Sequence, residues 1–139
     1  EPPVYPHRAE EKWCSTPMRN LSEMMGVPVS VREPTNWLEG GESLKLAGTT
    51  WRVVHTPGHS PGCVCFVHDA SQQAIVGDTL FAGSIGRIDF PTSDPAKMRH
   101  SIHEVIMTWP DAMTIYPGHG PTTTIGAERA SNSFVRFGF

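Results

Sequence analysis

The stretch HTPGHSPG, residues 55–62, decides the fold of this 139-residue chain more than any other. It ends a hydrophobic run, opens a Gly/Pro turn and places His59 in that turn. Two later stretches have the same character, GDTLF around Asp78 and YPGHGP around His119. An α/β scaffold presents its chemistry on loops at the ends of such runs. We therefore expect the three side chains to meet at one edge of a sheet.

His59, Asp78 and His119 are candidate metal ligands, because Zn²⁺ and other borderline metals take imidazole and carboxylate groups from proteins. Asp78 is also the candidate catalytic group, since its two oxygens suit a position between two ions. Neutral imidazoles are the binding form, so metal affinity should fall as the pH drops below ~6.5. The sequence has no His-x-His pair, no His-Glu-x-x-His and no Cys-x-x-Cys that would complete a metal shell locally.

Taken together, the three stretches resemble the metallo-β-lactamase superfamily, and within it the glyoxalase II-like (hydroxyacylglutathione hydrolase-like) single-domain hydrolases. HTPGH, GDTLFAGSIGR and PGHGPTTTIG follow one another in the family's order, and the likeness extends from about Val4 to about Phe134. It implies an α/β (α+β) chain with a metallo-β-lactamase-like αββα sandwich. The family's His-x-His-x-Asp-His loop, which supplies four further ligands, is not in this sequence. The expectation is one domain, residues 1–139, that forms the C-terminal portion of the fold with the N-terminal part missing.

The resemblance also implies roles for single residues. His59 would bind a first metal, Asp78 would bridge two metals and His119 would bind the second. The expected cofactor is Zn²⁺, one or two ions in the complete fold, with Fe or Mn as alternatives and an empty site in this chain as a third. Arg87 lies where related hydrolases place a basic residue that grips the substrate's carboxylate. The alternative is a surface ion pair between Arg87 and Asp89.

Two functions remain open at this stage. The first is hydrolysis of a small-molecule thioester by a metal-activated hydroxide, because a thiolate leaves without a strong general acid and two ions about 3.5–4 Å apart activate water. This chain alone would be inactive, since the four-ligand loop is absent. The second is a non-catalytic, oligomeric remnant that keeps the loop sequences without a working metal site. Half of a sandwich would expose apolar sheet surface, which predicts a homo-oligomer or pairing with the missing half.

Composition narrows the remaining classes. The chain is 38% hydrophobic and 18% charged, and its net charge of −3 gives nucleic acid no basic stripe to bind. No apolar run approaches the ~20 residues of a membrane span. Three cysteines, an odd number, argue for a reducing compartment, and we expect a cytoplasmic protein. Cys63 and Cys65 are either small buried hydrophobes or, for Cys63, a thiol within reach of the metal.

The periodicity of the chain predicts its elements. Hairpins are expected from strands 43–46 and 51–55, and from strands 63–68 and 73–76, and a buried strand over 113–116. A helix should begin near residues 92–95 with Ser93 or Asp94 as its N-cap, and another should close the chain over 125–134. A helix over 18–25 and a strand over 27–31 are expected near the N-terminus. His55 should orient the His59 loop, and the remaining histidines should be solvated: His7, His68, His100 and His103.

Overall fold

The computed structural model describes residues 3–139 of the chain. Its contacts divide the chain into two units, Glu1–Glu39 and Gly40–Phe139, each of which is described by itself. The prediction of a single domain over the whole chain therefore stays a prediction. Across the described residues, no helix has the length and apolar character that a membrane crossing requires.

The first unit is built from turns around one short 3-10 helix, Arg8–Glu10. The helix expected over 18–25 does not form, and that prediction is wrong. Leu21 has a φ of 65°, which interrupts a right-handed helix, and the N–H of Met24 closes a turn on the carbonyl of Leu21 at 3.1 Å. Met25 is 81% exposed, so the segment has no buried face whose packing would stabilise a helix.

The strand expected over 27–31 is also absent. Its backbone groups bond to side chains and turns instead: the N–H of Val29 donates to the Ser22 hydroxyl at 2.8 Å, and the N–H of Val31 donates to the carbonyl of Cys14 at 2.8 Å. His7 was expected to be solvated, but it is buried and forms a parallel bridge with Leu38. Local pattern predicts this unit poorly. Its side chains have helical or strand periodicity, but they do not pack against a sheet or a core that would stabilise a helix or strand.

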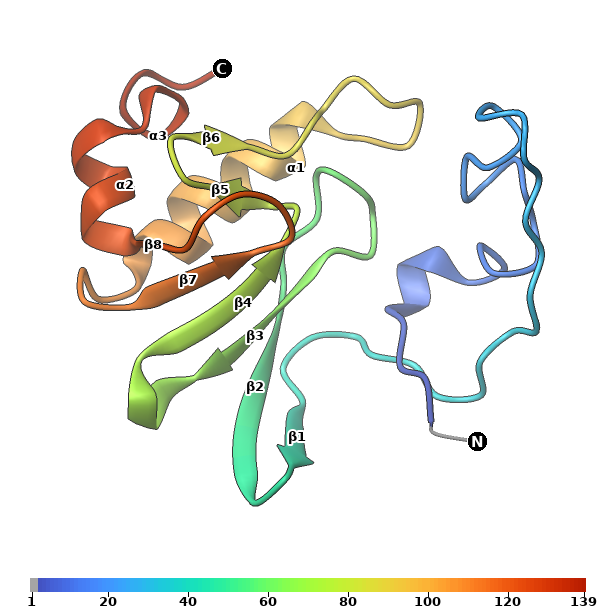
Figure 1. Ribbon diagram of the computed structural model, residues 1–139, viewed down its shortest axis with the longest axis horizontal. Helices are drawn as coiled ribbons and strands as arrows, with labels where there is room; N and C mark the ends of the chain where they lie inside the picture. Colours follow the sequence, from blue (N-terminus) through green and yellow to red (C-terminus); the bar gives the residue numbers. More distant parts are fainter. Residues whose placement is uncertain (1–2) are drawn as a thin grey trace. The chain divides into compact units, whose positions relative to one another are not determined.

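The second unit contains a six-stranded sheet in the order β1-β2-β3-β4-β7-β8 (Figure 1). All neighbours are antiparallel except β4 and β7, which are parallel. A separate two-stranded hairpin joins β5 to β6. The strands are β1 Ser43–Leu46, β2 Thr49–His55, β3 Val64–His68, β4 Gln73–Gly77, β5 Leu80–Phe81, β6 Ser84–Ile85, β7 Thr114–Pro117 and β8 Thr123–Thr124.

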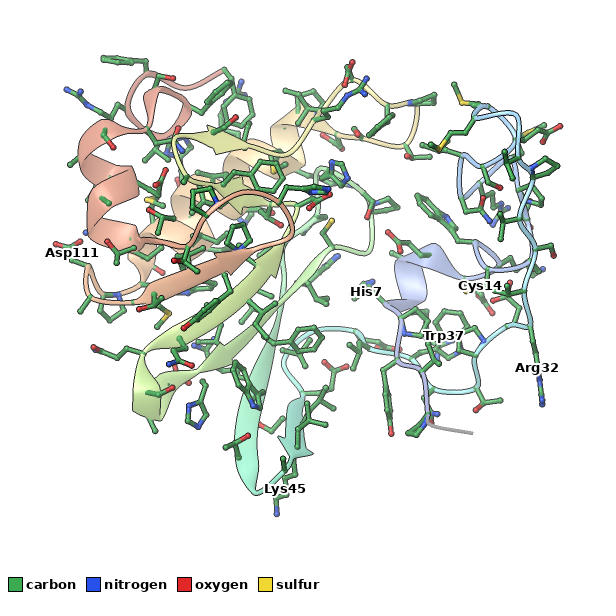
Figure 2. All side chains as sticks on the ribbon, viewed as in Figure 1. His7, Cys14, Arg32, Trp37, Lys45 and Asp111 are labelled. Carbon is green, nitrogen blue, oxygen red and sulfur yellow. The ribbon has the colours of Figure 1, made fainter. Side chains whose placement is uncertain are left out.

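Both predicted hairpins are present, with ends that differ by one or two residues. Alternation of apolar and polar residues sets their register, because a shift by one residue would exchange the two faces of the sheet. The turn between β3 and β4 ends at Gln72, whose φ of 51° reverses the chain. The β1–β2 hairpin carries Lys45 at its far end, where the side chain points away from the sheet (Figure 2). The β5–β6 hairpin was not predicted, since its strands are only two residues long.

One face of the sheet forms the core. The side chains on this face are fully buried and pack on the helical segment that follows residue 94. The sheet contributes Cys65, Val67, Ala74, Val76 and Ile115, and the helical segment contributes Met98, Ile102 and Ile106. On the opposite face, Ile75 is 45% exposed and Tyr116 38% exposed. This asymmetry between faces is what alternating strands produce when only one face meets a helix layer.

The helical segments follow the predicted pattern with one interruption. α1, Pro95–His100, begins at Asp94, whose side chain accepts the N–H of Lys97 at 3.0 Å, and continues through π and 3-10 turns to Thr108. The single helix expected over 125–134 is divided into α2, Ile125–Ser131, and α3, Ser133–Phe137. Asn132 separates them with a ψ of 118°, and α3 lies beside β6 (Figure 1).

Candidate metal centre

The three candidate ligands follow three strands that run in the same direction. β2 is antiparallel to β3, and β3 to β4, so β2 and β4 are co-directional, and β7 is parallel to β4. His59 follows β2, Asp78 follows β4 and His119 follows β7. Their loops therefore leave the sheet at the same edge, as the sequence predicts.

Asp78 lies between the two histidines and contacts both. Its Oδ1 accepts a hydrogen bond from Nδ1 of His119 at 2.9 Å, and its Oδ2 lies 3.6 Å from Nε2 of His59. The His59 and Asp78 side chains are 21% and 27% exposed, whereas that of His119 is 75% exposed. The centre is thus a half-buried His59–Asp78 pair with a more exposed imidazole at its rim.

The hydrogen bond of His59 shows which ring nitrogen carries the proton and which presents a lone pair to Asp78. Nδ1 lies 2.9 Å from the carbonyl oxygen of Arg87, and a carbonyl only accepts, so Nδ1 carries the proton. In the neutral imidazole Nε2 then presents its lone pair toward a carboxylate oxygen. Two acceptors at 3.6 Å form no hydrogen bond with each other. A cation placed between these two acceptor atoms would bind both of them.

The separation suits a metal ion. A tetrahedral ion with ligand distances of about 2.1 Å holds its ligand atoms about 3.4 Å apart, close to the 3.6 Å between Nε2 and Oδ2. His119 differs, because its Nδ1 already occupies Oδ1 of Asp78. Among residues 3–139, no group of three or more His, Cys, Asp or Glu side chains is arranged to hold an ion. The distance between His59 and Asp78 therefore fits two ligands of one ion.

The backbone of the His59 loop is held by the start and the end of α1. Three consecutive carbonyls, of residues 57–59, accept in chain order from the Ser101 hydroxyl at 2.7 Å, the Asp94 N–H at 2.8 Å and the Ser93 hydroxyl at 2.7 Å. His55, expected to orient this loop, contacts the carbonyl of Pro61 through Nε2 at 2.9 Å. Sequence reasoning missed the α1 contacts, because the donors lie 34 to 44 residues from their acceptors.

Two glycines give the centre its space. A Cβ on Gly118 would lie 2.2 Å from Oδ1 of Asp78, and a Cβ on Gly86 would lie 1.8 Å from the backbone oxygen of Asp78. Both distances are far inside van der Waals contact. The N–H of Gly118 also donates to the carbonyl of Gly77 at 2.8 Å, which brings the His119 loop against Asp78.

A shallow pocket of about 280 Å³ opens over the centre. Its walls are the three candidate ligands together with Phe81, Arg87 and Phe90. Arg87 and Asp89 form a bidentate ion pair at 2.8 Å, which raises the pKa of the guanidinium and lowers the pKa of the carboxyl through their mutual hydrogen bonds. The surface ion pair is therefore present. Arg87 also stacks over the Phe90 ring at 4.3 Å, which keeps it at the pocket rim.

The cysteines are thiols without a disulfide. Cys65 is fully buried beside the Thr56 hydroxyl at 3.3 Å, and burial raises the pKa of its thiol to about 12. This residue is a small core side chain, as the first of the two interpretations has it. The Cys63 sulfur lies 3.2 Å from the Ser60 hydroxyl. Its reach to a metal stays a prediction.

Comparison with known proteins identifies the class. Residues 1–119 match the metallo-beta-lactamase superfamily, and the chain belongs to it, which confirms the resemblance and the predicted fold class. A probable metallo-hydrolase of Streptococcus pyogenes is 38% identical over 96% of this chain and 59% of its own length. The hydroxyacylglutathione hydrolase GloC of Haemophilus influenzae is 34% identical over 95% of this chain and 63% of its own length.

Solved structures agree with this assignment. The B3 metallo-beta-lactamase BLEG-1 superposes with a TM-score of 0.88 at 38% identity, over 96% of this chain and 65% of that one. TTHA1623, solved in a di-iron-bound form, has a TM-score of 0.80 at 36% identity, over 95% of this chain and 64% of that one. The chain spans about three fifths of the length of these two curated relatives.

Proposed function

We propose that this chain is part of a metal-dependent hydrolase of the hydroxyacylglutathione hydrolase type, acting on a small thioester. One observation carries the proposal: Nε2 of His59 faces Oδ2 of Asp78 at 3.6 Å, a spacing that suits two ligands of one ion. The likeness to GloC supports the choice of a thioester, and the likeness to a di-iron protein leaves Fe beside Zn²⁺ and Mn as the metal.

In this proposal His59, Asp78 and His119 would hold the ion. Such an ion would supply a hydroxide near neutral pH and would polarise the substrate carbonyl. The Arg87 carbonyl holds His59 in the tautomer that leaves Nε2 available. Arg87 exchanges Asp89 for a substrate carboxylate, a change that costs little because exposed ion pairs contribute little to stability.

The aromatic walls give the pocket its shape. Phe90 contacts the His59 ring edge-on at 5.7 Å, and Phe81 contacts the His119 ring edge-on at 5.8 Å. Phe81 and Phe90 form the apolar part of the pocket lining beside the two histidines.

Metal binding is the direct test. Titration of the 139-residue chain with Zn²⁺ in competition with a chromogenic chelator should give binding that His59→Ala and Asp78→Asn each abolish. His100→Ala, which removes an exposed histidine outside the pocket, should leave the affinity unchanged. Equal affinity in the His59 and control variants would refute the metal centre and favour the non-catalytic alternative.

Activity is expected to be poor for this chain by itself. Two imidazoles and one carboxylate supply fewer ligands than a two-metal centre needs, and the sequence has no His-x-His-x-Asp-His loop. Hydrolysis of S-lactoylglutathione should therefore fall far below the usual enzymatic value of about 10 s⁻¹. Metal-dependent turnover near that value, lost in His59→Ala, would show that this chain needs no further ligands.

A further inference from the structure

Glu128 is a buried carboxylate that the metal centre does not use. It lies in α2 with 2% of its surface exposed. Oε1 accepts from the Thr123 hydroxyl at 2.6 Å, and Oε2 accepts from the N–H of Gly83 at 2.8 Å and the side-chain amide of Asn132 at 2.7 Å. An ionised carboxylate only accepts hydrogen bonds, so three donors match it and offset the cost of its burial.

The three donors belong to different segments, and one of them, Gly83, lies 45 residues from Glu128 in sequence. Thr123 begins β8, directly after the loop that carries His119. Gly83 forms the turn of the β5–β6 hairpin, whose first strand carries Phe81. Asn132 stands between α2 and α3 and also donates to the carbonyl of Ser84 at 3.0 Å, within the same hairpin. One carboxylate therefore joins the hairpin to the His119 loop.

The hairpin and the loop form opposite sides of one aromatic contact in the pocket. The Phe81 and His119 rings meet edge to face, with centroids 5.8 Å apart and planes at 80°. The His119 loop is exposed over residues 118–122 and is held at its first end by the Gly118 N–H on the carbonyl of Gly77. Thr123 holds its second end through the pairing of β8 with β7 and through its hydroxyl bond to Glu128.

We propose that Glu128 is a positioning residue for the pocket, which sets the spacing between the Phe81 and His119 rings through Gly83, Asn132 and Thr123. Glu128 acts through these hydrogen bonds. The contact between the two rings can be measured without a metal ion. The effect on metal affinity rests on the proposed function, because it requires His119 to be a ligand.

The test compares Thr123→Val, which keeps the shape and removes the hydroxyl, with Thr123→Ser, which keeps the hydroxyl. Glu128→Gln, whose amide offers one acceptor oxygen to three donors, removes part of the network from its centre. Glu104→Gln, an exposed carboxylate after α1, is the control for loss of charge. The readouts are the nuclear Overhauser cross-peak between the Phe81 and His119 rings in the metal-free chain, and the Zn²⁺ affinity.

Thr123→Val and Glu128→Gln should weaken the cross-peak and lower Zn²⁺ affinity by roughly 10-fold, the lower end of the effect of supporting residues at metal sites. Thr123→Ser and Glu104→Gln should keep both. A weakened cross-peak with unchanged affinity supports the positioning role and counts against His119 as a ligand. An unchanged cross-peak in a folded Thr123→Val chain overturns the inference, whatever the affinity does. The Thr123 pair decides the matter even if Glu128→Gln does not fold.

Discussion

Gly118→Ala should damage the proposed metal centre more than it damages the fold. The added Cβ would lie 2.2 Å from Oδ1 of Asp78 and 3.3 Å from its Cγ. Because ordinary contacts begin near 3.4 Å, either the carboxylate or the loop must move by about 1 Å. Both movements break or lengthen the 2.9 Å bond from His119 to Oδ1.

Two opposing terms give the size of the stability change. Overpacking costs typically 1–3 kcal/mol, while alanine restricts the unfolded chain and returns about 0.4–1 kcal/mol. The free energy of unfolding should thus fall by about 1–2 kcal/mol. Displacing a ligand changes metal affinity more, by roughly 10- to 100-fold, as when supporting contacts of a ligand are removed. Urea unfolding and chelator competition measure the two effects separately.

Gly120→Ala is the matched control in the same loop. Gly120 has a φ of 80° and no atom within 4 Å of a Cβ placed on it, so this change strains the backbone without touching Asp78. It should lower stability and leave metal affinity nearly unchanged. Full Zn²⁺ affinity in Gly118→Ala, or an equal loss of affinity in both variants, would show that overlap with Asp78 is not what lowers metal binding.

Three further predictions concern other parts of the chain. Hydrogen bonding, chiefly from the N–H of Lys97, holds the pKa of Asp94 below its ordinary 3.8, so its contribution to stability is present above that value and lost as the pH falls through the folded pKa; urea unfolding at several acidic pH values should show this loss, and Asp94→Asn should reduce it. Pulse alkylation followed by mass spectrometry should modify the partly exposed Cys14 well before the buried Cys65 in the folded chain, and fast labelling of Cys65 would contradict its raised pKa. Light scattering over a concentration series should show self-association that Ile75→Lys weakens, and a monomer at every concentration would contradict an interface on the exposed sheet face.

Much of the second unit can be predicted from local pattern. The paired strands around residues 47–48 and 69–72 alternate in polarity, and alternation is a property of neighbouring residues that the sheet only confirms. The N-cap of α1 is equally local, because Asp94 lies next to Pro95 and bonds a backbone group three residues away. The candidate ligands could be found because each lies in a short Gly/Pro loop after a hydrophobic run.

Local pattern fails where the outcome depends on what a segment packs against. The residues at 18–25 have helical spacing, but Leu21 adopts a positive φ and the side chains bury no face. The closing helix divides at Asn132 because its side chain bonds the β5–β6 hairpin and caps Phe134, and neither partner can be read from helix propensity. His7 is buried through its bridge to Leu38, 31 residues away.

The candidate metal centre likewise has some features set by the sequence and others set by the tertiary structure. His59, Asp78 and His119 can be recognised as candidate ligands from the sequence of their loops, since imidazole and carboxylate chemistry belongs to single residues. Their distances, the tautomer of His59 and the room beside Asp78 depend on groups from other loops, up to 41 positions away in sequence. Such contacts arise only when co-directional strands bring their ends to one edge, because a sequence specifies which side chains are available and folding specifies which of them meet.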